Sequence, residues 1–148
     1  MTLDETFELT GYHLTPGHFS SRILTTSSSD AKLFINEKPT YYLSLAGRLF
    51  QIPRGAQSDG ISAPQIAAAL GREHGGDDWI AGWFHDGTYR GWLLAYADGQ
   101  WLKAKLSRDE GDNLLRECAL ACGDSEAEAD TLREMVILFG RRNYQPAY

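Results

Sequence analysis

The sequence predicts an α+β fold, with a small antiparallel sheet in the N-terminal half and packed helices in the C-terminal half. Short segments rich in β-branched and aromatic residues, separated by turn residues, fill the first half. Longer segments with apolar residues at helical spacing fill the second half. The 148 residues are 43% hydrophobic and 23% charged, which is typical of a globular protein. We therefore expect residues 1–148 to form a single domain.

Turn residues set the limits of the strands that we expect in the first half. Thr15-Pro16-Gly17-His18 and Ala46-Gly47 are typical of turns. Pro53 ends the last strand, because proline has no amide hydrogen to donate to a neighbouring strand. The expected strands cover residues 7–14, 20–26, 32–36, 41–45 and 48–52.

Three helices are expected in the second half, each with a capping residue at its start and a glycine after its end. The two later helices begin with a capping box, in which a serine and a glutamate three residues later bond each other's backbone amides. The start and stop residues are Asp77 and Gly91, Ser107 and Gly123, and Ser125 and Gly140. Between the first two helices, Asp98-Gly99 predicts a hairpin that joins residues 93–96 to residues 101–104.

The segment Ser58-Asp59-Gly60-Ile61-Ser62-Ala63-Pro64 has the composition of a rigid loop. Gly60 permits a positive φ, and Pro64 suits the first turn of a helix that Ser62 caps. We expect a short helix over residues 65–70. We also expect this loop to pack beside the helix that carries His85, with the carboxylate of Asp59 close to it.

Charge and cysteine content exclude several classes of protein. The formal net charge of -6 opposes binding to phosphate backbones, so we expect no nucleic-acid partner. The start of the chain, Met1–Glu5, lacks the basic and apolar parts of a signal peptide, and no window is apolar enough for a transmembrane segment. Cys118 and Cys122 lie four residues apart in an expected helix, where a disulfide is awkward, and we expect both to be core thiols. These features predict synthesis in the cytoplasm, which is compatible with later packaging into a virion.

His85 is the most informative residue of the sequence. It lies in an expected helix among Trp83, Phe84 and Tyr89, where a protonated imidazole is unfavourable without a carboxylate partner. Asp86 is adjacent, but neighbouring side chains on a helix point about 100° apart. Asp112 lies near the start of the next helix. Antiparallel packing of the two helices would bring Asp112 to His85 and Tyr89.

These residues resemble the motifs of an uncharacterised family of short phage and prophage domains. The family pattern is Thr/Ser-Asp-Gly-x-Ser-x-Pro, then His-Asp-x-x-Tyr, then Ala-Asp-x-x-Phe. The first two motifs correspond to Ser58–Pro64 and His85–Tyr89, over a match that spans roughly residues 48–120. The third departs from the pattern, because it reads Gly111-Asp112-Asn113-Leu114-Leu115 here. The resemblance implies a phage or prophage protein and no particular activity.

The same residues also resemble the catalytic helices of the calcium-dependent phospholipase A2 superfamily, although its flanking cysteines and usual calcium loop are absent. This resemblance implies that His85 is the base that activates water and that Asp112 orients its imidazole. Tyr89 would then hydrogen-bond Asp112. Asp86 would be a ligand of Ca²⁺, and the loop at Asp59 would supply further oxygen ligands.

Two classes of function are therefore open. One is a metal-assisted hydrolase with a His85–Asp112 dyad, acting on a lipid or another envelope ester. The other is a non-enzymatic protein, either a virion component or a host-factor-binding protein, in which the same side chains form a buried structural network. The enzyme needs an open cleft at His85, whereas the structural network needs the cluster to be sealed.

Overall fold

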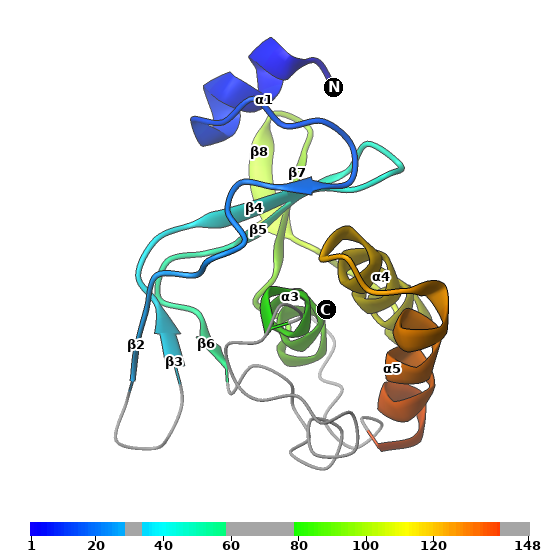
Figure 1. The fold of residues 1–148 in the computed structure, drawn as a ribbon. Coiled ribbons are helices and arrows are strands. Elements are labelled where there is room, and N and C mark those ends of the chain that lie inside the picture. Colours follow the sequence, from blue (N-terminus) through cyan, green and yellow to red (C-terminus); the bar gives the residue numbers. More distant parts are fainter. Residues whose placement is uncertain (29–33, 59–78, 140–148) are drawn as a thin grey trace.

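The computed structural model describes residues 1–28, 34–58 and 79–139 and shows an α+β fold, as the sequence predicts (Figure 1). Five antiparallel strands form the main sheet in the order β1-β4-β5-β7-β8, and a second antiparallel sheet has the order β2-β3-β6. The strands of the main sheet are β1 (His18–Phe19), β4 (Thr40–Leu43), β5 (Leu49–Ile52), β7 (Leu94–Ala97) and β8 (Gln100–Lys103). Those of the second sheet are β2 (Thr26–Ser28), β3 (Phe34–Asn36) and β6 (Gln57–Ser58).

The hairpin of β7 and β8 confirms the turn prediction at Asp98-Gly99. The strands pair antiparallel, with Ala97 opposite Gln100. Asp98 has a φ of 53° and Gly99 a φ of 77°. Two consecutive residues with positive φ are the geometry that a two-residue hairpin turn requires, and glycine and aspartate adopt it more readily than most residues.

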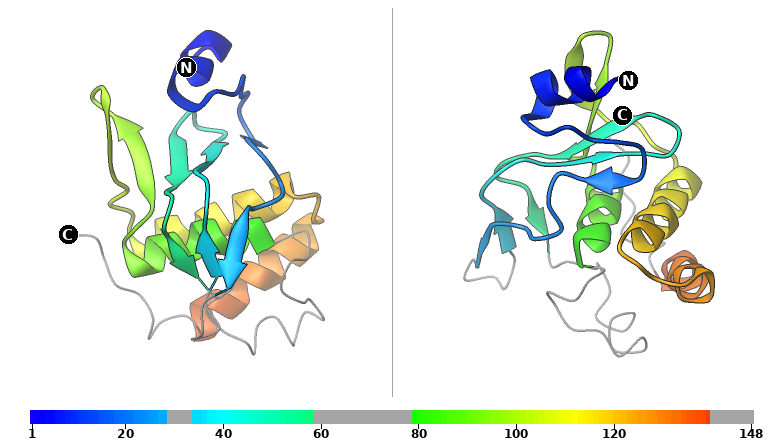
Figure 2. Two further views of the ribbon diagram at one scale, coloured as in Figure 1. Left: turned by 90° about the vertical axis from the view of Figure 1, so that its left-hand side faces the viewer. Right: turned by 45° about the horizontal axis from the view of Figure 1, so that its top comes forward.

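Three helices form a layer beside the main sheet: α3 (Trp79–Arg90), α4 (Arg108–Ala121) and α5 (Glu126–Phe139) (Figures 1 and 2). Both predicted capping boxes are present, at Ser107 and at Ser125. Gly91, with a φ of 78°, follows the end of α3 as expected. The expected N-cap of α3, Asp77, and the expected helix over residues 65–70 lie outside the described residues.

The predicted strand over residues 7–14 is wrong, because the chain forms helix α1 (Leu3–Thr10) there. Thr2 and Glu5 make a capping box, the same signal that begins α4, and Gly11 ends the helix in the left-handed conformation with a φ of 82°. The alternation expected over residues 7–14 therefore spans the end of the helix and the segment after it, in which Leu14 is buried. The hydroxyl of Thr6 accepts a 2.9 Å hydrogen bond from the backbone nitrogen of Leu14 and so ties the helix to the following segment.

The predicted strand over residues 20–26 is also wrong for most of its length. In this region the strands are β1, which ends at Phe19, and β2, which begins at Thr26. The hydroxyl of Ser21 accepts from the backbone nitrogen of Ile23 at 3.1 Å and donates to its carbonyl at 2.9 Å. Such local bonds of serine give the backbone an alternative to strand pairing.

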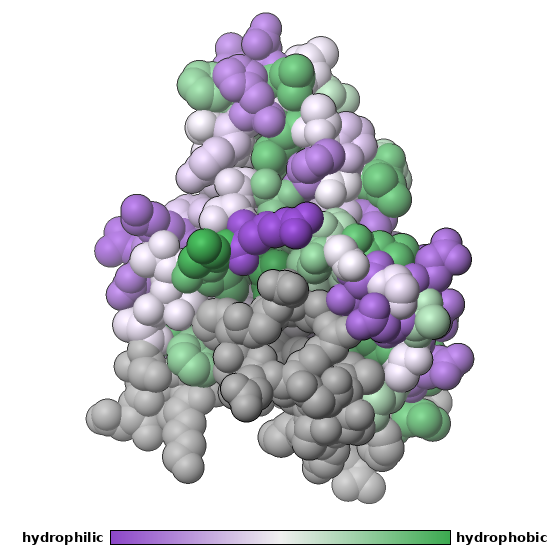
Figure 3. All heavy atoms as spheres, in the orientation of Figure 1, coloured by the Kyte–Doolittle hydropathy of each residue, from purple (hydrophilic) through white to green (hydrophobic). Residues whose placement is uncertain are grey.

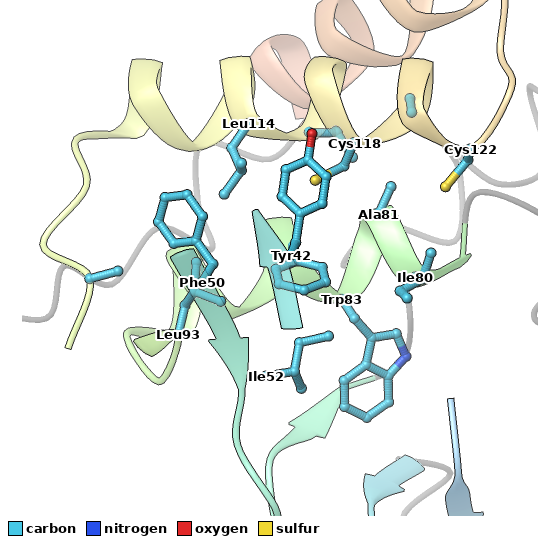
Figure 4. Packing of buried hydrophobic residues seen from close by; sticks show 14 of the residues in the cluster. Tyr42, Phe50, Ile52, Ile80, Ala81, Trp83, Leu93, Leu114, Cys118 and Cys122 are labelled. Atoms are coloured by element: carbon cyan, nitrogen blue, oxygen red, sulfur yellow. The ribbon is translucent and has the colours of Figure 1, made fainter. Parts of the chain in front are cut away.

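The main core lies between the sheet and the helix layer (Figure 4). Tyr42, Phe50 and Ile52 point from the sheet toward α3 and α4. Cys118 in α4 and Cys122, which caps the end of α4, are buried free thiols, as predicted. Burial raises the pKa of the Cys118 thiol and so disfavours its reactive thiolate.

The described surface mixes polar and apolar side chains. On the face in Figure 3, hydrophobic residues form separate groups among hydrophilic ones. Within the described ranges, no helix has the length and apolar character needed to cross a bilayer.

Candidate functional site

The predicted site lies where α3 crosses α4, and a glycine allows the two helices to approach closely there. A Cβ atom on Gly111 would lie 2.5 Å from Cγ2 of Thr88. Real Cβ atoms do not tolerate that distance, so a larger residue at this position would hold α4 away from α3. Asp112 follows Gly111 and thereby comes within reach of His85 and Tyr89, which lie one turn apart on α3.

His85, Tyr89 and Asp112 form a hydrogen-bonded cluster, as predicted from the sequence. The Nε2 atom of His85 lies 2.9 Å from Oδ1 of Asp112. The hydroxyl of Tyr89 donates to the same oxygen at 2.6 Å. The His85 and Tyr89 rings lie side by side, with centroids 4.2 Å apart. The side chains come from two helices, so the cluster depends on their packing.

The partner of Nε2 fixes the role of each imidazole nitrogen. A carboxylate only accepts hydrogen bonds, so Nε2 carries the proton that it donates to Asp112. In neutral His85 the lone pair is therefore on Nδ1. Nδ1 makes no hydrogen bond to any of the described residues. A neutral imidazole with one nitrogen held by a carboxylate and the other available as an acceptor can act as a general base.

Arg108 is a member of the cluster that sequence reasoning missed. Its Nε atom donates to the hydroxyl of Tyr89 at 3.2 Å and lies 3.9 Å from Oδ2 of Asp112. Its Nη2 atom donates to the backbone carbonyl of Ile137 on α5. The guanidinium therefore contacts α3, α4 and α5 at once. The spacing of four residues between Arg108 and Asp112 was the signal that could have found it.

The environment of the cluster keeps Tyr89 protonated. Burial is the main cause that raises the pKa of Tyr89, followed by the hydrogen bond to Asp112, while Arg108 opposes the change. A protonated Tyr89 continues to donate to Asp112 at neutral pH. Oδ2 of Asp112 is buried without a hydrogen-bond partner, and the guanidinium of Arg108 is the charge that compensates it.

Asp86, the predicted calcium ligand, is fully buried and paired with Arg90. Nε of Arg90 lies 3.0 Å from Oδ1 and 2.9 Å from Oδ2 of Asp86. Within the described ranges, no group of three or more His, Cys, Asp or Glu side chains could hold a metal ion. Asp59, the other predicted ligand, lies outside those ranges. A calcium site at Asp86 and Asp59 therefore stays a prediction.

The predicted position of the loop that begins at Ser58 is described only at its first residue. Ser58 is buried at the end of β6, and β6 contacts α3. Asp59 and the rest of the loop lie outside the described residues, so the placement of Asp59 beside the cluster also stays a prediction.

Comparison with family models, with curated proteins and with solved structures gives no match for this chain.

Proposed function

We propose that the protein is a hydrolase in which His85 activates water. Asp112 orients the imidazole of His85 and balances the positive charge that it gains. The observation that carries the proposal is the 2.9 Å contact between Nε2 of His85 and Oδ1 of Asp112, which leaves Nδ1 as the basic nitrogen. Tyr89 and Arg108 then fix the Asp112 carboxylate from two sides. Such an arrangement pre-organises a base without any movement of the backbone.

The chemistry that these residues support is ester hydrolysis. Water donates a hydrogen bond to Nδ1 of His85 and attacks the ester carbonyl carbon, while its proton passes to Nδ1. A C–O bond forms, and the carbonyl electron pair moves to oxygen. Asp112 stabilises the imidazolium that results. When the intermediate collapses, the bond to the alcohol oxygen breaks and the alkoxide takes the proton from Nδ1.

The substrate class in this proposal is a lipid or another envelope ester. It rests on the resemblance of His85, Tyr89 and Asp112 to the phospholipase A2 helices. A phage or prophage origin belongs to the same proposal and rests on the Ser58–Pro64 and His85–Tyr89 motifs.

Calcium is part of the proposal, with Asp86 and Asp59 as its ligands. Bound Ca²⁺ would polarise the ester carbonyl. Binding to the folded state alone would raise the melting temperature at millimolar Ca²⁺, relative to Mg²⁺ at the same concentration. A calorimetric titration that shows no heat, together with an unchanged melting temperature, would remove calcium from the proposal.

The burial of the cluster favours a second candidate function, in which its side chains have a structural role. The exposed fractions are 2% for His85, 1% for Asp112 and 0% for Tyr89. Buried polar networks of this kind can specify how helices pack, without any catalytic role. In that case the protein is a virion component or a host-factor-binding protein, and the cluster holds α3 against α4.

The variant His85→Ala separates the two candidates. As a hydrolase, the wild type should turn over a p-nitrophenyl ester and phospholipid vesicles in Ca²⁺, and the variant should lose this turnover at temperatures where it is still folded. As a structural network, it should lose roughly 1–3 kcal/mol of stability, because Asp112 and Tyr89 lose a buried partner. His13→Ala is the matched control, since His13 is exposed.

Asp112→Asn is the sharper companion, because it keeps the shape of the side chain and removes its charge. In the hydrolase it should reduce turnover strongly through a misoriented, less basic His85, with little loss of stability. Absence of esterase and phospholipase activity, combined with unfolding of His85→Ala several degrees below wild type, would refute the enzyme.

A further inference from the structure

A cavity of about 520 Å³ lies between the β5–β6 connection and the end of α3, apart from the His85 cluster. Its volume is within the range of pockets that hold small organic molecules. The described residues around it include two arginines and no aspartate or glutamate, in a protein whose net charge is -6. The charge of Arg90 is balanced by Asp86, whereas Arg54 is a positive charge without an acidic partner among the described residues.

Several polar groups at this cavity have no hydrogen-bond partner among the described residues. The side chains of Arg54 and Gln57 make no hydrogen bond or ion pair with other residues of the described ranges. Arg90 uses only Nε to hold Asp86, so both terminal amino groups of its guanidinium are available. The indole nitrogen of Trp92 is buried and donates to no described residue.

The indole of Trp92 belongs to the wall of the cavity, and its N–H is buried without a hydrogen-bond partner among the described residues. Buried donors are hydrogen-bonded in nearly all protein structures, because an unpaired one costs roughly 1–3 kcal/mol. Trp92 is fixed in place, since the six-membered ring of its indole packs on Gly87, where a Cβ atom would lie 2.5 Å from the ring. The indole cannot easily turn its N–H to solvent without losing that contact.

We propose that this cavity binds a small organic anion through a terminal oxyanion group, either a phosphate or a carboxylate. Arg54 and Arg90 provide the charge and the planar donor sets that pair with such oxygens. The amide of Gln57 supplies a further donor, and the indole ring of Trp92 forms an aromatic part of the wall beside it. Pro53 and Ala56 form an apolar wall for the body of the ligand. The proposal does not depend on hydrolysis at His85.

The test follows the indole N–H signals of the full chain by NMR while phenyl phosphate or benzoate is added. Trp92→Phe identifies the signal of Trp92 among the four tryptophans. Both anions should shift this signal saturably, and added salt should weaken their binding. Phenol, which has the same ring without the charge, should bind at least roughly tenfold more weakly. The stronger of the two anions identifies the oxyanion that the site prefers.

Arg54→Gln should weaken binding of phenyl phosphate about tenfold or more. Arg116→Gln is the matched control, because Arg116 pairs with the exposed Asp130 on the helix layer and should leave binding unchanged. Arg90→Lys keeps the charge opposite Asp86 and removes the planar donor set, so it should also weaken binding. No shift at Trp92, equal binding of phenol, or undiminished binding to Arg54→Gln would each overturn the proposal.

Discussion

The interface between α3 and α4 has two ends with opposite chemistry. At one end, Thr88 and Gly111 are in close contact, and His85 and Tyr89 hydrogen-bond Asp112. At the other end, Ile80 and Ala81 of α3 lie near Cys118 of α4 and near its C-cap Cys122 in the apolar core (Figure 4). The same two helices are thus held by directional bonds at one end and by apolar burial at the other.

This difference predicts different responses to substitution. Apolar contacts lose stability in proportion to the volume removed, and the remaining side chains relax into part of the space. Buried hydrogen-bonded groups respond to geometry, because a small displacement leaves charges and donors unpaired. We therefore expect small changes of shape at the polar end to break the hydrogen bonds of the cluster. Loss of side-chain volume at the apolar end should lower the free energy of unfolding.

The largest expected effect on stability is at the apolar end. Ile80→Ala should reduce the free energy of unfolding by roughly 2–5 kcal/mol, because Ile80 is only 1% exposed and its loss leaves a cavity. Chemical denaturation monitored by circular dichroism measures this change. Ile23→Ala is the control, since Ile23 is 82% exposed. Equal effects of the two substitutions would contradict the assignment of Ile80 to the core.

A smaller effect is expected from Gly111→Ala at the polar end. The new methyl group would meet Cγ2 of Thr88 at 2.5 Å, which should cost about 1–3 kcal/mol and separate His85 from Asp112. Adding Thr88→Ser removes that methyl and keeps the hydroxyl that donates to the carbonyl of Phe84. The double variant should recover most of the lost stability in a thermal melt. No recovery would show that the helices are separated by some other contact.

The smallest expected effect concerns Glu110, at the start of α4. Hydrogen bonds from the backbone and side chain of Ser107 lower the pKa of Glu110. A lowered folded-state pKa means stability that is present above the unfolded pKa, near 4.3, and lost as pH falls through the folded pKa. Glu110→Gln should reduce stability at pH 7 by less than about 1 kcal/mol, since the group is exposed. The difference between variant and wild type should disappear in acid, as pH-dependent melting would show.

The sequence predicts the C-terminal half better than the N-terminal half. The reason is that the signals in the C-terminal half lie within a few residues of each other. Capping boxes at Ser107 and Ser125 and the turn at Asp98-Gly99 act over a few residues and are visible in the sequence. Helix α1 carries the same kind of signal at Thr2 and Glu5, but the partial alternation of the following residues favours a strand. Local bonds of Ser21 then displace the strand expected over residues 20–26.

Part of the candidate site could be predicted from the sequence. Helical periodicity indicates which side chains share a face, and a buried imidazole needs a hydrogen-bond partner. His85, Tyr89 and Asp112 satisfy both conditions. Arg108 was missed because the position of its side chain depends on α5, where it donates to the carbonyl of Ile137. The cavity proposed to bind an anion was missed because Arg54 and Arg90 are far apart in sequence, and only the packing of β5 and β6 beside α3 brings them together.

The position of Arg108 also couples the hydrogen-bonded cluster to helix α5. One guanidinium holds the hydroxyl of Tyr89 and the carbonyl of Ile137, which lies in the last turns of α5. Docking of α5 therefore adds a bond that holds this guanidinium beside Tyr89 and Asp112. We expect the cluster and α5 to open together, as one cooperative unit. In hydrogen exchange, the slowest opening that exposes the amides of α5 should then be the same opening that separates the side chains of the cluster.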